Sequence, residues 1–338
     1  MATMTDVALR AGVSTTTVSH VLNGTRPVAE ATRERVMSAI DETGYIHNTI
    51  ARSLVTASTL TIGVVVSAIS NPYFMDLVHV IEAEISAAGY LVLLVDSKDD
   101  PDEELRVVQS LHSRRVDGYV VAPSGDPDQR ALRYLARHGL PTVLVDRLAS
   151  GEFDQVGVEN VESTARLVDH LASLGHRRIA MIAGQEGLGT TTERLEGYRV
   201  GLERSGLAVE PGLVTSGFSD VEPARRAVHE LLALASPPTA LIAANNQMTI
   251  GTLEGLEDLG LRVPEDIALV SFDDFAWAHL FRPRLTAMAQ PIQEIGEAAA
   301  RLLLARIHDP ERPVETVRFP ATFMHRESCG CAPHGTHR

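Results

Sequence analysis

Residues 5–24 read TDVALRAGVSTTTVSHVLNG, and this stretch predicts two short helices joined by a tight turn. The first helix covers about residues 4–11, and Gly12 can end it because glycine accepts the positive φ of a helix stop. The second helix ends at Asn23, and a third segment of helical periodicity at 30–43 can brace the pair. Together the three segments predict a helix-turn-helix unit.

Beyond residue 60 short apolar runs alternate with segments of helical periodicity. The apolar runs are TIGVVVS (61–67), YLVLLVDS (90–97), VDGYVVAP (116–123), PTVLVD (141–146), RIAMIAG (178–184), TALIAANN (239–246) and IALVSFDD (267–274). The helical patterns lie at 74–88, 102–114, 128–138, 161–174, 193–205, 221–234 and 247–259. Such alternation predicts parallel sheets with helices on both faces. We therefore expect an all-α helix-turn-helix head followed by an α/β body of two doubly wound parallel-sheet lobes.

The composition limits the functions that the chain can have. Its 338 residues suit a small module plus a two-lobed one, and its formal net charge is −14. Residues 1–60 hold five arginines and five acidic residues, so the head is near neutral and the rest of the chain carries the negative charge. An acidic body repels DNA, so we expect any contact with DNA to be made by the head.

Compartment and membrane association also follow from composition. Cys329 and Cys331 outline no disulfide framework, which fits a reducing compartment. No apolar run is long enough to span a bilayer, and charges stand near the amino terminus where a signal peptide needs apolar residues. We therefore expect a cytoplasmic protein that binds no membrane.

A series of short motifs along nearly the whole chain resembles the LacI/GalR family of bacterial regulators. The motifs are TDVA (5–8), VSTTTVS (13–19), VLNG (21–24), ARSL (51–54), IGVV (62–65), GHRRI (175–179), GLRVPED (260–266), SFDD (271–274) and RES (326–328). The resemblance implies a transcriptional repressor, not an enzyme, with a periplasmic-binding-protein-like body. It also implies a homodimer that binds a palindromic operator at the bacterial nucleoid and is controlled by a small-molecule effector between its lobes.

The resemblance further implies how the chain is divided. We expect a head at 1–46, a hinge helix or linker at 47–59, an N-terminal lobe from 60–160 and 291–320, a C-terminal lobe from 161–290 and 321–330, and a disordered tail at 331–338. By composition alone the linker segment is a plain linker. In the family it becomes a helix on operator DNA, and its leucine wedges into the minor groove. Leu54 occupies that leucine position, whereas His47 stands where the family usually has proline.

The outward face of the second helix supplies the expected DNA contacts. The candidates for base contact are Thr15, Thr16, His20 and Arg26. The candidates for phosphate contact are Thr5, Ser14, Thr17 and Ser19. Asn23, Arg52 and Leu54 complete the DNA-binding set. For the small polar residues, helix capping or a solvated face is the alternative.

The resemblance places the effector between the lobes. The residues that map there are Tyr73, Phe74, Asp146, Arg147, Arg194, Phe218, Asn245 and Asp273. Asp146, Asn245 and Asp273 each follow a long apolar run, which places them at the carboxyl ends of strands, where such sheets bind ligands. Carboxylates, an amide and an arginine can bond hydroxyl groups, and aromatic rings can cover a flat face. The alternatives are core packing for the two phenylalanines and a surface ion pair for Arg147.

Two effector classes stay open. The run 14–23 most resembles the purine-repressor members of the family, but Leu188 and Ser124 stand where those members have an arginine and a tyrosine. The carboxylate and amide set favours a sugar or sugar derivative over a purine-like corepressor. Asn246 and Ser271 stand beside the cleft where the family usually has an aspartate and a glycine. The sequence therefore does not predict which particular effector the cleft selects. Effector binding would close or twist the lobes and so change the distance between the two hinges of the dimer. If the effector is a sugar, we expect its binding to release the operator.

Other classes of protein fit less well. A sugar-binding transport protein would share the body but has no use for the head. The chain has no G-x-S-x-G elbow, phosphate loop or H-E-x-x-H motif, so it offers no catalytic residues. His325, Cys329, Cys331, His334 and His337 have donor atoms for a soft metal, but C-x-C lacks the usual spacing of a structural zinc site. We therefore expect no metal site and no cofactor.

Overall fold

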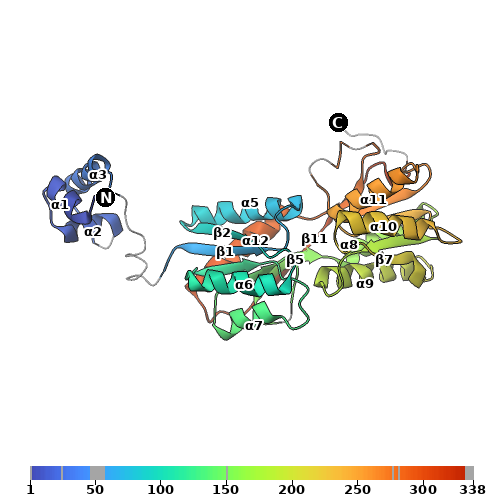
Figure 1. Ribbon diagram of the computed structural model, residues 1–338, viewed down its shortest axis with the longest axis horizontal. Coiled ribbons are helices and arrows are strands. Elements are labelled where there is room, and N and C mark those ends of the chain that lie inside the picture. Colours follow the sequence, from blue (N-terminus) through green and yellow to red (C-terminus); the bar gives the residue numbers. More distant parts are fainter. Residues whose placement is uncertain are drawn as a thin grey trace. The chain divides into compact units, whose positions relative to one another are not determined.

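Three helices form the head in the computed structural model: α1 (Met4–Ala11), α2 (Thr15–Asn23) and α3 (Glu30–Thr43). Gly12 follows α1 at φ 65°, a left-handed conformation that favours glycine, and this lets the chain turn into α2. Val7, Val18 and Val36 come from one helix each, and their burial forms the small core of this unit. The predicted helix-turn-helix head is confirmed (Figure 1).

The structure describes residues 2–23, 26–45, 58–149, 151–275, 278–280 and 282–331. It divides the chain into two units, Met1–Thr59 and Leu60–Arg338. Among the residues of these ranges, no helix is long and apolar enough to cross a membrane.

The first sheet of the second unit has six strands in the order β11-β5-β4-β3-β1-β2, and every pair is parallel. The strands are β1 (Thr61–Val66), β2 (Leu91–Asp96), β3 (Gly118–Val121), β4 (Thr142–Val145), β5 (Asp154–Glu159) and β11 (Thr316–Pro320). The helices around them are α5 (Pro72–Ala87), α6 (Pro101–Ser113), α7 (Arg130–Arg137) and α12 (Ile292–His308). We call this sheet and its helices the first lobe.

Helices cover both faces of the first sheet. Ile62, Val64 and Val66 of β1 pack with residues of α5 and α12, whereas Val65 packs with residues of α6 and α7. Figure 1 shows the two helix pairs on opposite sides of the strands. A parallel sheet is normally buried on both faces, which explains why β1 is apolar at almost every position instead of alternating.

The second sheet has the order β12-β10-β9-β8-β6-β7. Its strands are β6 (Ile179–Ala183), β7 (Val214–Ser216), β8 (Ala240–Ala243), β9 (Ala268–Phe272), β10 (Thr286–Ala289) and β12 (Thr322–Met324). Its helices are α8 (Val161–Ser173), α9 (Gly189–Arg204), η1 (Pro211–Leu213), α10 (Val221–Leu232) and α11 (Asn246–Asp258). We call this sheet and its helices the second lobe, and the predicted fold class of two doubly wound lobes is confirmed.

One strand departs from the parallel pattern that the sequence predicts. β12 pairs antiparallel with β10, whereas the other strands of the second sheet pair in parallel. Only Ala321 separates β12 from β11 of the first lobe, so the chain runs straight from one sheet into the other. β12 therefore enters the second sheet directly from β11 and runs along the edge of β10 in the opposite direction.

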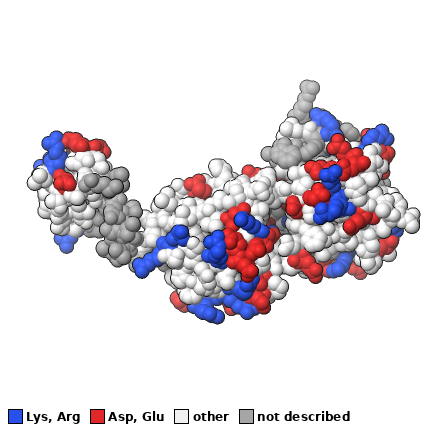
Figure 2. All heavy atoms as spheres, viewed as in Figure 1, with Lys and Arg blue, Asp and Glu red and all other residues white. Residues whose placement is uncertain are grey.

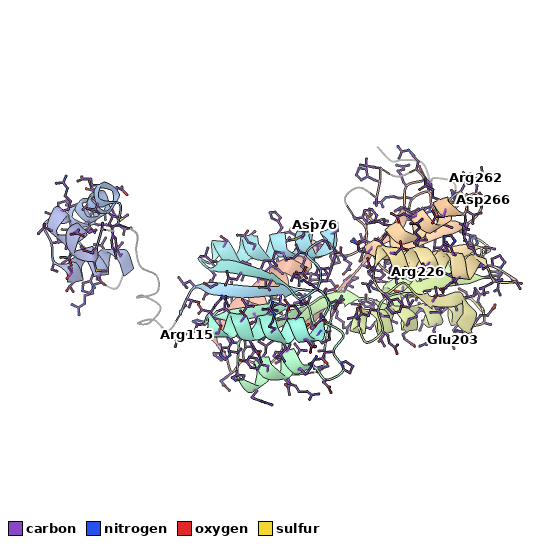
Figure 3. The ribbon with its side chains drawn as sticks, viewed as in Figure 1. Asp76, Arg115, Glu203, Arg226, Arg262 and Asp266 are labelled. Carbon is purple, nitrogen blue, oxygen red and sulfur yellow. The ribbon has the colours of Figure 1, made fainter. Side chains whose placement is uncertain are left out.

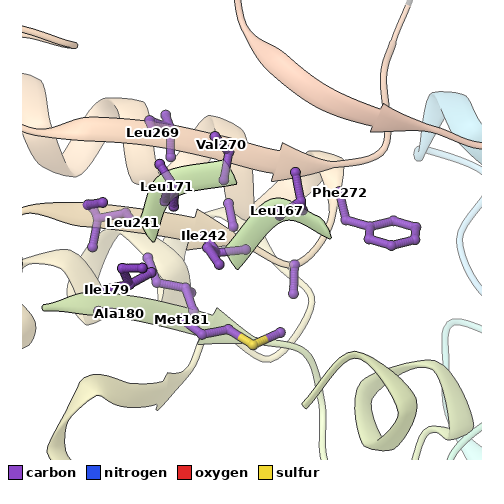
Figure 4. Packing of buried hydrophobic residues seen from close by; sticks show 14 of the residues in the cluster. Leu167, Leu171, Ile179, Ala180, Met181, Leu241, Ile242, Leu269, Val270 and Phe272 are labelled. Atoms are coloured by element: carbon purple, nitrogen blue, oxygen red, sulfur yellow. The ribbon is translucent and has the colours of Figure 1, made fainter. Parts of the chain in front are cut away.

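The core of the second lobe lies between its sheet and helices. Leu167 and Leu171 of α8 pack in one cluster with residues of β6, β8 and β9, and Figure 4 shows this packing. Gly197 of α9 lies so close to α8 that an added Cβ would meet the Val161 carbonyl oxygen at 2.3 Å. The helices therefore approach each other through positions that have no side chain.

The chain passes between the two sheets three times. It crosses after β5 at Asn160, after β10 at Pro291 and after β11 at Ala321. These crossings place the carboxyl ends of strands from both sheets around one cleft. The pairing of each strand shows to which lobe it belongs. The exact domain boundaries at 160, 290 and 320 stay a prediction.

Charged side chains cover the surface of the body. Figure 2 shows acidic and basic residues side by side on its visible face. Arg262 and Asp266, labelled in Figure 3, form one such exposed pair, with Arg262 Nε 3.0 Å from Asp266 Oδ2. Exposed pairs of this kind contribute little to stability because water and salt screen them. They leave the surface of the body polar, while the excess of acidic over basic residues in the chain makes it negative.

Candidate functional site

A cavity of about 420 Å³ lies between the carboxyl ends of the strands of the two lobes. This volume is within the range of about 300–1,000 Å³ that is usual for small-molecule sites. All eight predicted effector residues line it: Tyr73, Phe74, Asp146, Arg147, Arg194, Phe218, Asn245 and Asp273. The structure therefore brings them together, while their contact with an effector stays a prediction.

The backbone is strained along the cavity wall. Among the described residues, nine that are not glycine have a positive φ. Those that line the cavity are Lys98, Asp99, Asp146, Phe218, Ser219 and Asp273. A left-handed conformation costs a non-glycine residue about 1–3 kcal/mol, and such strain gathers at ligand sites, where the surrounding structure holds it.

Arg147 is buried in the wall and not on the surface. Its Nη2 donates to Asp99 Oδ2 at 2.8 Å, and its Nη1 donates to the Pro123 carbonyl oxygen at 2.9 Å. Its guanidinium also lies 5.9 Å from the centre of the Phe74 ring. Arg147 therefore does form an ion pair, as the alternative prediction held. The pair with Asp99 lies in the cavity wall, however, and not on the protein surface.

Arg194 reaches the cavity from α9 and is held on three sides. Its Nε donates to Asn160 Oδ1 at 2.9 Å, and its Nη1 donates to the Ala244 carbonyl oxygen at 2.5 Å. The guanidinium lies 3.7 Å from the centre of the Phe272 ring. Its Nη2 has no hydrogen-bond partner within the described part of the chain, so this atom can serve a ligand.

Tyr73, Asp146, Asp273 and Gln290 form a polar network in the wall. The Tyr73 hydroxyl donates to Gln290 Oε1 at 3.2 Å, and Gln290 Nε2 donates to Asp273 Oδ1 at 2.6 Å. Burial raises the pKa of Asp146 above its ordinary value, although Arg147 and Arg194 oppose the shift. Burial and the charges of Asp146 and Asp273 raise the pKa of Tyr73 well above its ordinary value. Tyr73 is therefore a neutral hydroxyl donor at physiological pH.

Asn245 and Phe218 line the cavity as predicted, but Asn245 is also a helix cap and Phe218 is largely exposed. Asn245 caps α11, because its Oδ1 accepts from the Met248 backbone N–H at 2.7 Å, and its Nδ2 donates to the Ser219 carbonyl oxygen at 3.3 Å. Phe218 is 59% exposed at the cavity wall, whereas Phe74 is buried in the core of the first lobe. The two rings are thus unequal, and Phe218 alone presents most of its surface to solvent.

The sequence did not single out several polar residues of the wall. They are Ser67, Asn71, Asp96, Lys98, Asp99, Thr190, Thr191, Asp220, Gln247 and Gln290. Ser67 and Asp96 end the apolar runs of β1 and β2, so the rule that selected Asp146 would have found them. Gln290 follows β10, a strand that the apolar pattern of the sequence does not predict.

The departures from the family pattern have structural consequences. Ser271 is buried in β9, and its hydroxyl has no hydrogen-bond partner among the described residues, a cost of about 1–3 kcal/mol that a glycine would avoid. Asn246 Nδ2 donates to Asn71 Oδ1 at 2.7 Å across the cleft. Leu188 is buried and lines the cavity, and with Ser124 it also borders a smaller adjoining cavity.

In the head, the predicted base-contact residues Thr15 and Thr16 are exposed on α2, and Arg26 is exposed after it. His20 and Ser19 are half-buried on α2, and Thr5 is exposed on α1. Ser14 and Thr17 lie 2.9 Å apart through their hydroxyl oxygens, and Ser14 Oγ accepts from the Thr17 backbone N–H at 3.1 Å. Ser14 therefore caps α2, as the alternative to phosphate contact allowed.

Several predicted positions lie outside the described residues. These are Arg52, Leu54 and His47 of the linker, the side chain of Asn23, and tail residues 332–338. Their roles stay predictions. Cys331, expected to begin the tail, is half-buried and packs against the core of the second lobe.

Comparison with known proteins supports both parts of the chain. A family model described as bacterial regulatory proteins, lacI family, matches residues 3–48, and one of a periplasmic binding protein-like domain matches residues 168–329. The HTH-type transcriptional repressor PurR of Photobacterium profundum is 35% identical over 311 residues, which span 91% of this chain and 93% of that protein.

Solved structures agree. The lac repressor dimer bound to operator and the anti-inducer ONPF matches with a TM-score of 0.87 at 27% identity, covering 97% of this chain and 99% of that chain. The complex of the transcriptional regulator CelR with cellobiose matches with a TM-score of 0.74 at 32% identity, covering 97% of this chain and 100% of that chain.

Proposed function

The chain belongs to the lacI family of bacterial regulatory proteins, and from this premise we propose that it represses transcription as a homodimer on a palindromic operator, under the control of a sugar bound between its lobes. Its relatives are transcriptional repressors, so the chain is a DNA-binding regulator and not an enzyme. The homodimer, the form of the operator and the sugar are the proposed parts. A regulator of this kind acts at the bacterial nucleoid, in the cytoplasm.

The charge of the cavity wall carries the sugar proposal. The carboxylates on the wall are Asp96, Asp99, Asp146, Asp220 and Asp273, and the cations are Lys98, Arg147 and Arg194. An excess of carboxylates disfavours phosphorylated or carboxylated effectors, because like charges repel in a partly dry cavity. Neutral polyols instead donate their hydroxyl protons to carboxylates in strong charge-assisted hydrogen bonds. The related regulator CelR forms a complex with cellobiose, which is a neutral sugar.

A purine-like corepressor is the second candidate. It is supported by the resemblance of residues 14–23 to purine-repressor members and by the match to PurR over 91% of the chain. Against it stands Leu188, whose buried apolar side chain lines the cavity where a polar group would be needed to bond a base. A sugar-binding transport protein stays a distant alternative, since it would leave the head without a role.

An apolar sheet edge supports the homodimer. β2 is the last strand at one end of the first sheet, and there Leu91 is 72% exposed and Leu93 is 38% exposed. An exposed apolar edge strand is a template for association with another chain. A second copy of the chain would cover it, and light scattering on the purified protein should give twice the mass of one chain.

For the mechanism, we propose that the head contacts bases through α2 and that Leu54 enters the minor groove at the centre of the operator. Arg52 would contact DNA in the same linker. Effector binding would close the lobes and favour a conformation whose linkers no longer fit both half-sites, so the operator is released. The three chain crossings between the lobes permit such a movement.

A two-part screen tests the effector proposal. The full chain is examined by thermal shift with cellobiose, glucose, galactose and ribose and, in parallel, with adenine, guanine, hypoxanthine and xanthine. Each hit is then added to the protein bound to a fluorescent operator, selected from random DNA, and release is followed by anisotropy. We expect one sugar to raise the melting temperature and to release the operator.

Matched variants make the screen specific to the cavity. Asp273→Asn removes a wall carboxylate and should weaken the sugar response, whereas Asp76→Asn changes an exposed carboxylate on α5 and should leave it unchanged. A purine that shifts the melting temperature, with no sugar doing so, would replace the sugar proposal by the corepressor. A chain that selects no DNA sequence would contradict operator binding itself.

A further inference from the structure

Two histidines and two cysteines meet in the second lobe, away from the cavity. They are His170 in the last turn of α8, His325 just after β12, and Cys329 and Cys331 in the segment that follows. Their donor atoms all lie within 4.8 Å of one another, and the described part of the chain has no other group of three or more such donors. We call these four residues the carboxyl-terminal cluster.

The geometry points to a metal site, and we propose that the carboxyl-terminal cluster binds one zinc ion. Cys329 Sγ lies 3.2 Å from Cys331 Sγ, and Cys331 Sγ lies 3.5 Å from His170 Nε2. Tetrahedral zinc binds sulfur at about 2.3 Å and nitrogen at about 2.0–2.1 Å, so its donor atoms are roughly 3.3–3.8 Å apart. These two distances are near that spacing, and no two of the four donor atoms are more than 4.8 Å apart, so small side-chain movements would complete the tetrahedron.

The donor set also selects the ion. Two thiolates and two imidazoles form one of the usual ligand sets of structural zinc, and they neutralise its charge of two. Magnesium and calcium prefer oxygen ligands, and no carboxylate belongs to the cluster. A disulfide between the two cysteines would not explain why two imidazoles lie beside the sulfur atoms.

The segment that carries the cysteines is already fixed in place by other contacts. Ser328 Oγ donates to the Leu269 carbonyl oxygen at 2.6 Å, and Arg284 Nη2 donates to Glu327 Oε1 at 2.7 Å. Arg326 Nη2 donates to Asp274 Oδ2 at 2.6 Å. None of these contacts uses a donor of the cluster, so little chain entropy is lost when a metal ion binds.

The surroundings suit a structural site with one open side. Cys329 is fully buried, while His170 and Cys331 are half-buried, which leaves a route for the ion to enter. The Phe323 ring meets the His170 ring edge to face at 5.0 Å and stacks on the His325 ring at 6.1 Å. These ring contacts limit the orientations of both imidazoles. A bound ion would thus tie the carboxyl-terminal segment to α8 within the second lobe.

Cysteine spacing alone could not show this site. Residue 170 precedes Cys329 by more than 150 positions, and C-x-C is not the usual zinc spacing. The fold supplies the missing ligand, because α8 packs against β9 and β10, and β12 pairs with β10. The expectation of no metal site rested on the tail alone, without His170.

The test uses the untagged full chain. Metal analysis after dialysis against zinc should give one zinc per chain, and cobalt in its place should give the visible absorption of tetrahedral thiolate coordination. The chain has two cysteines, both in the cluster, so thiol alkylation reports on this site alone. Zinc should slow alkylation at least about tenfold, and a chelator should restore it.

Variants separate a metal site from a packing role. Loss of a residue that only hydrogen-bonds to a metal ligand lowers metal affinity about 10–100-fold. Cys331→Ser and His170→Gln each remove a ligand itself, so each should lower zinc affinity about a hundredfold or more. His308→Gln, in the last turn of α12, is the matched control and should bind zinc as the parent does. Removal of residues 333–338, which include His334 and His337, should also leave zinc binding unchanged.

Three results would overturn the proposal. One is zinc binding that survives Cys331→Ser undiminished, and another is zinc binding that disappears with the last six residues. The third is a reduced protein that takes up no zinc and returns to a Cys329–Cys331 disulfide, seen as a loss of two hydrogens by mass spectrometry. Operator binding is not the readout, so these results are independent of the proposed regulatory function.

Discussion

At the scale of single residues, Asp146 brings a carboxylate into the cavity wall at a cost in stability. Burial raises its pKa in the folded chain above the ordinary value of 3.8. As the pH rises, the unfolded chain therefore loses this proton first, and the free energy of unfolding falls between the two pKa values. The carboxylate weakens the empty protein in the same pH range in which it is available to a ligand.

We predict that Asp146→Asn removes this loss of stability. The free energy of unfolding of the variant, relative to the parent, should increase as the pH rises above 3.8. Effector affinity should fall about tenfold or more, because a hydrogen bond to a charged group contributes about 1.5–3 kcal/mol. Urea unfolding between pH 4 and pH 8 measures the first effect, with Asp76→Asn as control. A relative stability that decreases with pH would contradict the assignment.

A second prediction concerns the DNA face of the head. His20→Ala should cost about 1–3 kcal/mol of operator binding free energy and relax the preference at one base pair. Binding to a panel of operators with single base-pair changes measures it. An equal loss against every operator of the panel would show that His20 makes no base-specific contact.

The residues of the cavity show what sequence reasoning reaches and what it misses. Asp146 and Asp273 were predictable because each follows an apolar run, and parallel strands end at a common edge. The capping role of Asn245 was not predictable in that way, because it depends on the position of the first turn of α11. Lys98 and Asp99 were missed because their place in the wall depends on a left-handed turn after β2.

At the scale of elements, helix pairs pack through glycines. An added Cβ on Gly251 of α11 would lie 2.0 Å from the Val221 carbonyl oxygen of α10. This atom belongs to the backbone, so it cannot move aside as a flexible side chain does. The same relation holds between α9 and α8 at Gly197.

We predict that Gly251→Ala lowers the free energy of unfolding by about 1–3 kcal/mol, because overpacking outweighs the gain in helix propensity of about 1 kcal/mol. Urea unfolding measures the change. Gly212→Ala is the control, because an added Cβ there meets no atom within 4 Å, and it should change stability by less than about 0.5 kcal/mol. Equal effects of the two substitutions would refute the close-packing account.

The elements that the sequence predicted are those with a strong local pattern. The three head helices match within a residue or two, and each of the seven apolar runs contains a strand of the structure. The sequence pattern did not predict β5, β7, β10, β11, β12 or α12. β11 and β12 are short edge strands in which no residue is fully buried, so they lack a continuous apolar run, and their pairing depends on contacts distant in the chain.

At the scale of the whole molecule, side chains connect the two lobes across the cleft. Asn246 of α11 donates to Asn71 before α5 in a buried hydrogen bond. Arg318 of β11 pairs with Glu193 of α9 at 2.7 Å, in a more exposed position. The buried bond should restrain the lobes more than the exposed ion pair does, because water competes less with it.

We predict that Asn246→Ala shifts the empty protein toward a more open arrangement of the lobes. The loss of one buried hydrogen bond, about 1 kcal/mol, should lower effector affinity by up to about tenfold and increase the radius of gyration measured by small-angle X-ray scattering. Arg318→Gln is the comparison and should have a smaller effect. An unchanged radius of gyration and affinity in Asn246→Ala would show that this bond does not hold the lobes.

The last strands of the chain lie at the edges of both sheets, β11 in the first and β12 in the second. During translation, therefore, neither lobe can complete its sheet until residues 316–324 have been made. A chain whose synthesis stops earlier carries two open strand edges, and such edges recruit other chains. In a truncated product β5 and β10 would be the outermost strands of their sheets, whereas β11 and β12 cover them in the full chain, so we expect prematurely ended chains to aggregate more readily.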